Sequence, residues 1–253
     1  MYSGNFSTLH LPYTLINTKD VVMKIHFTQL STLFQKHKQL IVFLVLMSIF
    51  RSAIADWYTV PSGSMQPTIE VGDRIFVNKM AYDLRFPFTA VSLISLDNPK
   101  HGEIVVFESN TANLRLIKRI IGLPGDVVAM KNDVITVNGH QLEYFSLAGS
   151  QDKTDTSNVN YYSEKVSLIK HRINIDTTTN NQLSNFAAVI VPKGHYLVLG
   201  DNRRHSADSR VYGFVPHSEL RGKATEIAFS LDYDNYYIPR KERFFQNIYA
   251  RNL

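Results

Sequence analysis

Two serines in a short turn-forming segment are the first residues of this chain that could do chemistry. Residues 61–68 read PSGSMQPT, so Ser62 and Ser64 flank Gly63 between two prolines. Proline fixes the backbone angle φ and glycine lets another backbone approach closely, so such a segment can hold a hydroxyl rigidly. A serine hydroxyl with an adjacent backbone amide could attack a carbonyl carbon and hold the resulting oxyanion. The same composition is also typical of an ordinary linker.

A serine nucleophile needs a base, and Lys118 is the candidate. The chain has no cysteine and no G-x-S-x-G motif, which excludes a thiolate nucleophile and a hydrolase-type nucleophile elbow. Lys118 lies in the apolar run LIKRII, residues 116–121. Because a strand alternates faces, only one of Lys118 and Arg119 need be exposed. An exposed Lys118 would be an ordinary surface lysine. Burial would instead lower the pKa of its amine from about 10.4, and the neutral amine could take the Ser64 proton.

A third polar segment, GDNRRHSADSR at residues 200–210, lies between two β-branched runs. Its simplest interpretation is a solvated loop, in which Asp208 and Arg210 form a surface ion pair worth less than about 1 kcal/mol. In the catalytic interpretation, the Ser206 hydroxyl hydrogen-bonds to the neutral lysine amine and orients it. The Asp208–Arg210 pair would then brace the loop.

The elements that must position these residues are mostly strands. After residue 60 the chain consists of short β-branched runs broken by turn residues, without a sustained helical period. The predicted strands are 74–78, 103–107, 116–121, 127–130, 134–137, 187–191, 196–199 and 225–229. The dipeptide Asn138-Gly139 predicts a type I′ hairpin turn, and GLPG at 122–125 predicts another tight turn. Residues 143–185 are polar and predict an inserted lobe on the β core.

An apolar run precedes the first serine segment. Residues 40–50 read LIVFLVLMSIF and are followed by Arg51, whereas a membrane span needs about 20 residues. Three interpretations remain: a retained anchor that extends toward residue 60, a signal peptide cleaved at the A-x-A site 53–55, and a buried core helix. We favour the anchor. The lysine excess before residue 40 then places the N-terminus in the cytoplasm and everything after residue 60 outside it.

The expected organisation follows from these segments. Because residues 1–22 lack a core-like pattern and Met23 opens a compact basic lead into the apolar run, we expect translation to start at Met23. The expected parts are an N-terminal cytoplasmic segment (1–38), a transmembrane anchor (39–58), a catalytic β domain (59–230, with the lobe at 143–185) and a C-terminal tail (231–253).

The overall composition excludes several classes. A chain of 253 residues with 44% hydrophobic residues can build a core, which excludes a disordered or fibrous protein. A net charge of +5 is too small and too scattered to indicate a nucleic-acid groove. The chain has no phosphate-binding glycine loop, and its nine histidines lack ligand spacing. We therefore expect no metal, no cofactor and no nucleic-acid partner.

Taken together, the three segments resemble the type I (leader) signal peptidase family in their order, their amino-acid sequence and their position after a membrane anchor. The similar segments are VPSGSMQPTIEVGDRIFVNKMAY (60–82), LIKRIIGLPGD (116–126) and GDNRRHSADSRVYGFVP (200–216). The resemblance runs from about residue 39 to residue 227. The N-terminal segment, the polar insertion and the tail are not covered.

The resemblance implies a role for each matching residue. Ser64 matches the nucleophile and Lys118 the general base, while Ser62 and the Ser64 amide match the oxyanion hole. Ser206 matches the hydroxyl that orients the lysine, and Asp208 and Arg210 match the bracing pair. The positions that would line shallow apolar pockets for the small residues at −1 and −3 of a signal peptide are Tyr58, Val60, Met65, Ile69 and Ile117.

The chain departs from the family pattern at three positions. Arg204 and His205 stand where the family usually has an acid and an amide, and Leu116 stands where an aromatic residue is common. These departures put the local loop geometry and the substrate preference in doubt rather than the chemistry. We expect the positive charge of Arg204 to lower the pKa of Lys118 further.

The expected fold is mostly β, with a signal-peptidase-like antiparallel catalytic core, a polar inserted lobe and one N-terminal transmembrane helix. The expected protein is a membrane-bound serine endopeptidase that removes signal peptides from exported preproteins. It would be a single-pass protein of the bacterial inner membrane, with its catalytic domain on the extracytoplasmic side and with preprotein signal peptides and the lipid bilayer as partners. The alternatives are a conjugative-transfer-type signal peptidase and a non-catalytic membrane-tethered β binding module. The sequence leaves open the oligomeric state, the substrate repertoire and self-cleavage after Ala55.

Overall fold

The computed structural model describes residues 18–89, 91–147, 158–179 and 181–250. Most of the segment before the predicted start at Met23 lies outside these residues. The chain divides into two compact units, Met1–Ser48 and Ile49–Leu253. All of the candidate site residues belong to the second unit.

Helix α1 spans Thr18–Ala53 and contains the apolar run. Except for the partly exposed Ile41, the large apolar side chains along residues 40–50 are exposed, from Ile49 at 38% to Leu46 at 60%. Among the helices that the structure describes, none combines the length and the apolar character that crossing a membrane requires. The helix ends at Ala53, and strand β1 (Ala55–Thr59) begins two residues later. The end of the 39–58 range therefore forms a strand of the second unit rather than helix.

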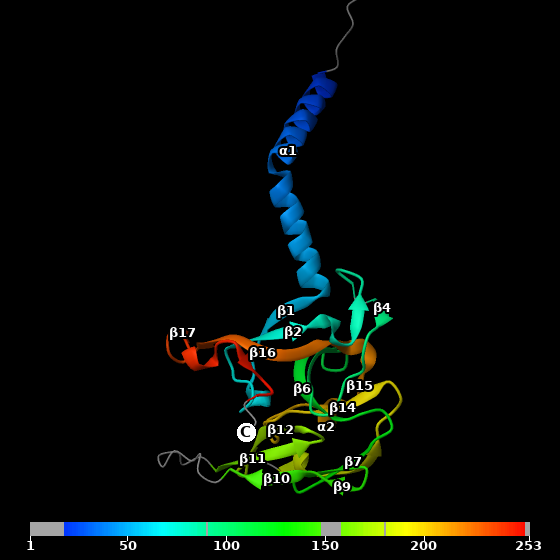
Figure 1. Cartoon of the computed structure of the whole chain (residues 1–253), viewed down its shortest axis with the longest axis vertical. Coiled ribbons are helices and arrows are strands. Elements are labelled where there is room, and N and C mark those ends of the chain that lie inside the picture. Colours follow the sequence, from blue (N-terminus) through cyan, green and yellow to red (C-terminus); the bar gives the residue numbers. More distant parts are fainter. Residues whose placement is uncertain (1–17, 90, 148–157, 180, 251–253) are drawn as a thin grey trace, which may run out of the picture. The chain divides into compact units, whose positions relative to one another are not determined.

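The second unit is built on antiparallel sheets (Figure 1). Within the described residues its largest sheet has nine strands, with β1, β2, β16, β5, β6, β14 and β15 hydrogen-bonded in that order and β17 and β18 paired to β16. Besides β1, these strands are β2 (Asp73–Asn78), β5 (Ile104–Ser109), β6 (Leu114–Gly122), β14 (His195–Leu199), β15 (Val215–Pro216), β16 (Leu220–Asp232), β17 (Ile238–Pro239) and β18 (Gln246–Asn247).

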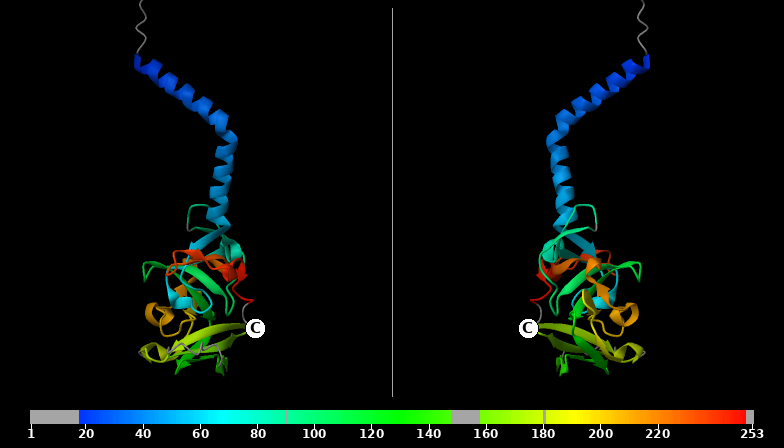
Figure 2. Two further views of the ribbon diagram at one scale, coloured as in Figure 1. Left: turned by 90° about the vertical axis from the view of Figure 1, so that its left-hand side faces the viewer. Right: turned by 90° about the vertical axis from the view of Figure 1, so that its right-hand side faces the viewer.

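Three smaller sheets complete the strands of the described residues. They are β3 (Asp83–Arg85) with β4 (Ser92–Ser95), then β13 (Phe186–Ile190) with β7 (Val127–Lys131), β8 (Val134–Val137) and β9 (His140–Gln141), and finally β10 (Glu143–Ser146) with β11 (Val159–Val166) and β12 (Ile169–Asp176). Figure 2 shows that the β10–β12 sheet lies at the opposite end of this unit from β1 and β2. The short helices are α2 (Ser209–Tyr212) and the 3-10 turns η1 (Gly63–Met65), η2 (Lys79–Ala81), η3 (Asn181–Ser184), η4 (His217–Glu219) and η5 (Lys241–Arg243).

The eight predicted strands are all present, with ends shifted by a few residues. Asn138 and Gly139 have positive φ angles of 52° and 80° between β8 and β9, as the predicted hairpin turn requires. In the other predicted turn, the amide of Asp126 donates to the carbonyl of Leu123. The prediction missed β1, the lobe strands β10, β11 and β12, and the short strands β3, β4, β9, β15, β17 and β18. The longest of these, β11 and β12, were missed because they read as polar sequence.

Buried aliphatic side chains of β2, β5, β6, β14 and β16 form the core of this unit. The segment after residue 230, which we expected to be a tail, packs against this core. Ile248 is 2% exposed within it, and Arg243 forms a buried ion pair with Asp73. The catalytic segments therefore lie on a continuous β framework that the C-terminal segment helps to cover.

Candidate active site

The structure brings Ser64 and Lys118 into direct contact. Ser64 lies in η1, the turn that the proline- and glycine-containing segment forms, and Lys118 lies on β6. The Nζ atom of Lys118 donates a hydrogen bond of 2.6 Å to the Oγ atom of Ser64. The two residues are 54 positions apart in the sequence. This distance lies within the hydrogen-bonding range that a nucleophile and its base need.

Burial sets the protonation of Lys118. Its side chain is 2% exposed, and burial lowers the pKa of its amine from 10.5 to about 8. The carboxylates of Asp208 and Asp201 oppose this shift, and the guanidinium of Arg210 adds to it. A lysine with this pKa has a neutral amine in a useful fraction near neutral pH, as a general base requires.

Ser62 immediately precedes η1 in an extended conformation, with φ of −134° and ψ of 154°. Its side chain makes no capping hydrogen bond to the turn and is exposed to solvent. The hydroxyl is therefore available to a ligand. This placement suits the oxyanion-hole role predicted for Ser62 and Ser64.

The segment 200–206 is hydrogen-bonded to the turn that carries Ser64. The backbone amide of Asn202 donates to the carbonyl of Ser64 at 3.1 Å, and its side-chain amide donates to the carbonyl of Gly63 at 3.1 Å. A Cβ atom at Gly200 would collide with the carbonyl oxygen of Ser64 and with the side chain of Ser206. Asn202 and Gly200 were quoted in the motif without a role, and only their contacts reveal one.

Ser206, predicted to orient the lysine, is 2% exposed. Its hydroxyl has no hydrogen-bond partner within the described residues, so a bond to Lys118 is not seen. The predicted bracing pair is present, because Nε and Nη2 of Arg210 donate to the two carboxylate oxygens of Asp208 at 2.8 and 2.7 Å. Arg210 also donates to the carbonyls of Arg203 and Leu183. The pair is buried and ties the motif to two other segments.

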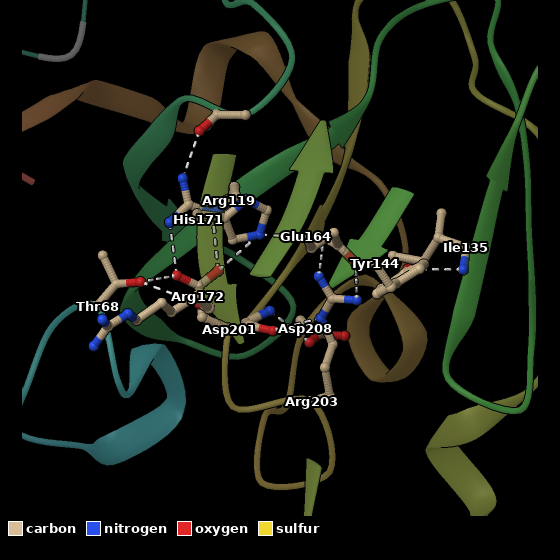
Figure 3. Close-up of polar contacts among 12 residues, drawn as sticks. Thr68, Arg119, Ile135, Tyr144, Glu164, His171, Arg172, Asp201, Arg203 and Asp208 are labelled. Atoms are coloured by element: carbon tan, nitrogen blue, oxygen red, sulfur yellow. Dashed lines mark hydrogen bonds and ion pairs between the residues drawn. The ribbon is translucent and has the colours of Figure 1, made fainter. Parts of the chain in front are cut away.

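Arg119, the neighbour of the lysine, is also buried, at 1% exposure, which corrects the expectation that one of the two would be exposed. Its guanidinium forms a bidentate pair with Asp201 at 2.9 and 2.6 Å and donates to the carbonyl of Gly102. Asp201 also accepts from the hydroxyl of Thr68, downstream of the nucleophile (Figure 3). One carboxylate thus joins the strand of the base to the segment of the nucleophile.

The inserted lobe forms a second buried charge cluster with the segment 200–206. The guanidinium of Arg203 donates to both carboxylate oxygens of Glu164 on β11, and all three groups of the cluster, including His171 on β12, are 0% exposed (Figure 3). Burial opposes ionisation of Glu164, but Arg203 and His171 hold the pKa of its carboxyl below the ordinary value. Burial lowers the pKa of His171. No sequence motif pointed to Glu164 or His171.

The two departures from the family motif have partners of their own. Arg204 donates to Asp133 at 2.7 Å, and His205 lies 3.0 Å from a carboxylate oxygen of Asp176. The charges that shift the pKa of Lys118 are those of Asp208, Asp201 and Arg210, and the expected contribution of Arg204 is not among them. The charge of Arg204 is instead offset by Asp133.

The predicted pocket residues come together beside the dyad in one apolar cluster. Val60, Met65 and Ile69 are buried at 2% exposure or less, while Tyr58 and Ile117 are partly exposed at the margin of the cluster. The three buried side chains can form the floor of a shallow subsite. Tyr58 and Ile117 are the members that a substrate side chain could reach directly.

Comparisons with known proteins identify one family. Residues 33–229 match the family model described as signal peptidase, peptidase S26. A signal peptidase I of Pseudomonas fluorescens is 34% identical over 75% of this chain and 69% of its own length. One of Buchnera aphidicola from Schizaphis graminum is 33% identical over 90% and 81%. A solved signal peptidase I structure from Enterococcus faecalis, 30% identical, covers 52% of this chain and all of its own, with a TM-score of 0.34.

The chain therefore belongs to the type I signal peptidase family and is a serine peptidase.

Proposed function

We propose that this chain is a membrane-anchored serine endopeptidase that removes signal peptides from exported preproteins, with Ser64 as nucleophile and Lys118 as general base. The observation that carries the proposal is the 2.6 Å hydrogen bond between a buried lysine amine and the serine hydroxyl. Family membership supports the substrate class, since the relatives are named signal peptidase I.

Acylation begins with the neutral amine of Lys118. It accepts the proton of the Ser64 hydroxyl as Oγ attacks the carbonyl carbon of the scissile peptide bond. The negative charge that develops on the carbonyl oxygen is stabilised by the Ser62 hydroxyl and the Ser64 amide. Loss of one such donor costs about 3–4 kcal/mol of transition-state stabilisation. Lys118 then gives its proton to the leaving amine, and the signal peptide remains esterified to Ser64.

Deacylation repeats these steps with water. Lys118, again neutral, takes a proton from a water molecule that attacks the ester carbonyl, and the Ser64 hydroxyl is regenerated. The arrangement of Ser206 beside Gly200, and of Asp208 with Arg210, keeps the wall around the amine rigid. The apolar cluster beside the dyad accepts small side chains at −1 and −3, with Tyr58 and Ile117 at its accessible margin.

The proposed location is the bacterial inner membrane. The exposed apolar side chains of residues 40–50 support an anchor, because such a surface is stable in lipid and costly in water. The lysines before this run place the N-terminus in the cytoplasm and the catalytic unit outside. Ser64 follows the end of α1 at Ala53 by eleven residues, so the nucleophile would act near the bilayer surface where a signal peptide emerges.

The test is cleavage of a preprotein by the detergent-solubilised full chain, with the product identified by N-terminal sequencing. We expect wild-type protein to release the mature chain after a small residue, and Ser64→Ala and Lys118→Ala to reduce the rate by at least about 10⁴-fold. Lys100→Ala, which removes an exposed lysine at 67% side-chain exposure, is the matched control and retains full activity.

Equal processing by wild type and Lys118→Ala, or no processing by either, would contradict the proposal. The latter result would favour the membrane-tethered binding module considered from the sequence.

A further inference from the structure

A cavity of about 250 Å³ lies where the last residues of α1 meet the β framework of the second unit. Neither Ser64 nor Lys118 lines it, but Tyr58, at the margin of the predicted substrate cluster, does. Ser52 and Ala53 line one side of it. Phe88, from the segment between β3 and β4, lines another side, and its backbone amide donates to the hydroxyl of Ser52 at 2.7 Å. The catalytic mechanism uses no polar group of this cavity.

The lining of the cavity is basic. It carries the four cations Lys79, Arg85, Arg115 and Arg221 and one carboxylate, Glu108. Glu108 is shared, because Arg115 donates to one of its oxygens at 2.7 Å and Arg221 to the other at 2.8 Å.

The two remaining cations have carboxylate partners just outside the lining. Lys79 lies 3.2 Å from Asp56, and Arg85 lies 3.1 Å from Asp83. The Nη1 atom of Arg85 has no hydrogen-bond partner within the described residues. The four cations of the lining outnumber the three carboxylates Glu108, Asp56 and Asp83, so a net positive charge remains at the cavity. Arginine is well suited to binding a phosphate.

Apolar side chains continue from the rim of the cavity. Phe88 is 71% exposed, and other large apolar residues of the β3–β4 hairpin are between 49% and 60% exposed, namely Phe86, Val91, Leu93, Ile94 and Leu96. The cavity also follows the apolar run directly, since Ser52 lies two residues after Phe50 in the same helix. Apolar groups on the rim and cations inside match the acyl chains and the phosphate of a lipid.

We propose that this cavity binds the phosphate headgroup of an anionic phospholipid of the surrounding bilayer, with the β3–β4 hairpin in the lipid interface. The inference rests on the membrane location in the proposed function. It assigns the cavity to the bilayer rather than to the preprotein, and it places the headgroup beside the end of the anchor.

The test is native mass spectrometry of the full chain released from neutral detergent micelles with phosphatidylglycerol or phosphatidylcholine of identical acyl chains. We expect one saturable phosphatidylglycerol site with at least about tenfold preference over phosphatidylcholine. Arg85→Gln with Arg221→Gln should weaken that site by about tenfold or more, since each removes a cation from the phosphate. The charge-retaining pair Arg85→Lys with Arg221→Lys should restore most of the binding.

Arg240→Gln is the matched control. Arg240 has a side-chain exposure of 20%, close to the 21% of Arg221, and it also pairs with carboxylates, but it does not line the cavity. Its substitution should leave lipid binding unchanged. Equal binding of the two lipids, or undiminished phosphatidylglycerol binding by the double glutamine variant, would overturn the proposal. Displacement of the lipid by equimolar inorganic phosphate would make this a free-anion site instead.

The remaining alternative is that the cavity binds the preprotein, and preprotein cleavage in neutral detergent tests it. The double glutamine variant should keep the wild-type KM and kcat, because its cations would bind lipid and not substrate. A raised KM would assign the cavity to the preprotein chain and overturn the inference. Lipid binding is measured without turnover, so a failure of the peptidase proposal would show as absent cleavage with lipid binding intact.

Discussion

At the scale of single residues, the proposed chemistry depends on how far burial lowers the pKa of one lysine. Lys118 is in contact with Ser64 and is 2% exposed, and its pKa falls to about 8. The nearby carboxylates Asp201 and Asp208 raise this pKa, and Arg210 lowers it, so the value is a balance between burial and three charges. This balance has two measurable consequences, one for activity and one for stability.

The activity should follow the neutral form of Lys118. We expect kcat/KM to rise about tenfold per pH unit below pH 8 and to level off above it, because only the neutral amine accepts the Ser64 proton. Arg204→Asp should leave the midpoint of this profile in place, since Asp133 already pairs with Arg204. A midpoint moved by a full unit in that variant would show that Arg204 acts on the base after all.

The stability should respond in the same sense as the activity, but over the higher range between pH 8 and pH 10.5. The pKa of Lys118 is about 8 in the folded chain and 10.5 in the unfolded chain. Between these pH values the unfolded chain binds more protons than the folded chain. The free energy of unfolding therefore falls as the pH drops from 10.5 to 8. Lys118→Met should therefore stabilise the inactive protein by up to about 3 kcal/mol below pH 8, and the gain should vanish near pH 10.5. Urea unfolding at pH 7 and pH 10.5 measures this, and an equal gain at both pH values would contradict it.

At the scale of elements, the inserted lobe is part of the frame of the active site. Strand β11 presents Glu164 to Arg203, and His171 on β12 lies 3.1 Å from Glu164. The backbone amide of Arg203 also donates to the carbonyl of Asn174 on β12 at 3.0 Å. The segment 200–206 therefore lies between the lobe and the nucleophile turn. The sequence suggested an accessory lobe, but these contacts couple it to the motif that carries Ser206.

Breaking the Glu164–Arg203 pair should be costly. Glu164→Gln leaves a buried guanidinium without its counter-charge, and we expect the free energy of unfolding to fall by about 3–5 kcal/mol. The control is Glu143→Gln in the same lobe, whose side chain is 55% exposed and pairs with Lys165, and which should cost less than about 1 kcal/mol. Chemical denaturation of both variants measures their free energies of unfolding. Similar decreases in the two variants would refute a structural role for the buried pair.

At the scale of the whole molecule, the end of the helix and the start of the sheet share one short segment. Ala53 and Ala55 are each 8% exposed, and Ala55 pairs with Asn78 as β1 joins β2. The A-x-A signal at 53–55 is therefore folded into the unit that carries the active site. A protease needs its substrate in an extended and accessible form, which this segment lacks once β1 has paired.

We expect the folded chain to resist self-cleavage after Ala55. N-terminal sequencing and intact mass of the purified membrane form should show a chain that still contains residues 53–55. Trp57→Pro places a proline within β1, where Trp57 pairs with Phe76, and leaves the A-x-A signal intact. It should make the segment easier to cleave if strand pairing is what protects it. Cleavage of the wild-type folded chain at this position would show that the strand opens more readily than its burial implies.

Several features of this protein could be predicted from the sequence because they depend on local patterns. The alternation of β-branched runs and turn residues predicted the eight strands and the turn at Asn138-Gly139. The resemblance of three sequence motifs to those of the family pointed to Ser64, Lys118, Asp208 and Arg210. Strands β11 and β12 were missed because some of their buried side chains are polar or ionisable, among them Glu164 and His171. Such groups are stable inside a protein only when distant partners bind them.

What the sequence by itself determined was the set of reactive groups and the strands that carry them. The tertiary structure decided which groups meet: Lys118 with Ser64, Asp201 with both Arg119 and Thr68, and Arg203 with Glu164. It also decided that Lys118 and Arg119 are both buried, although alternation along a strand suggested otherwise. The physical reason is that desolvation and ion pairing depend on neighbours far away in the chain, and only the packed sheets bring those neighbours together.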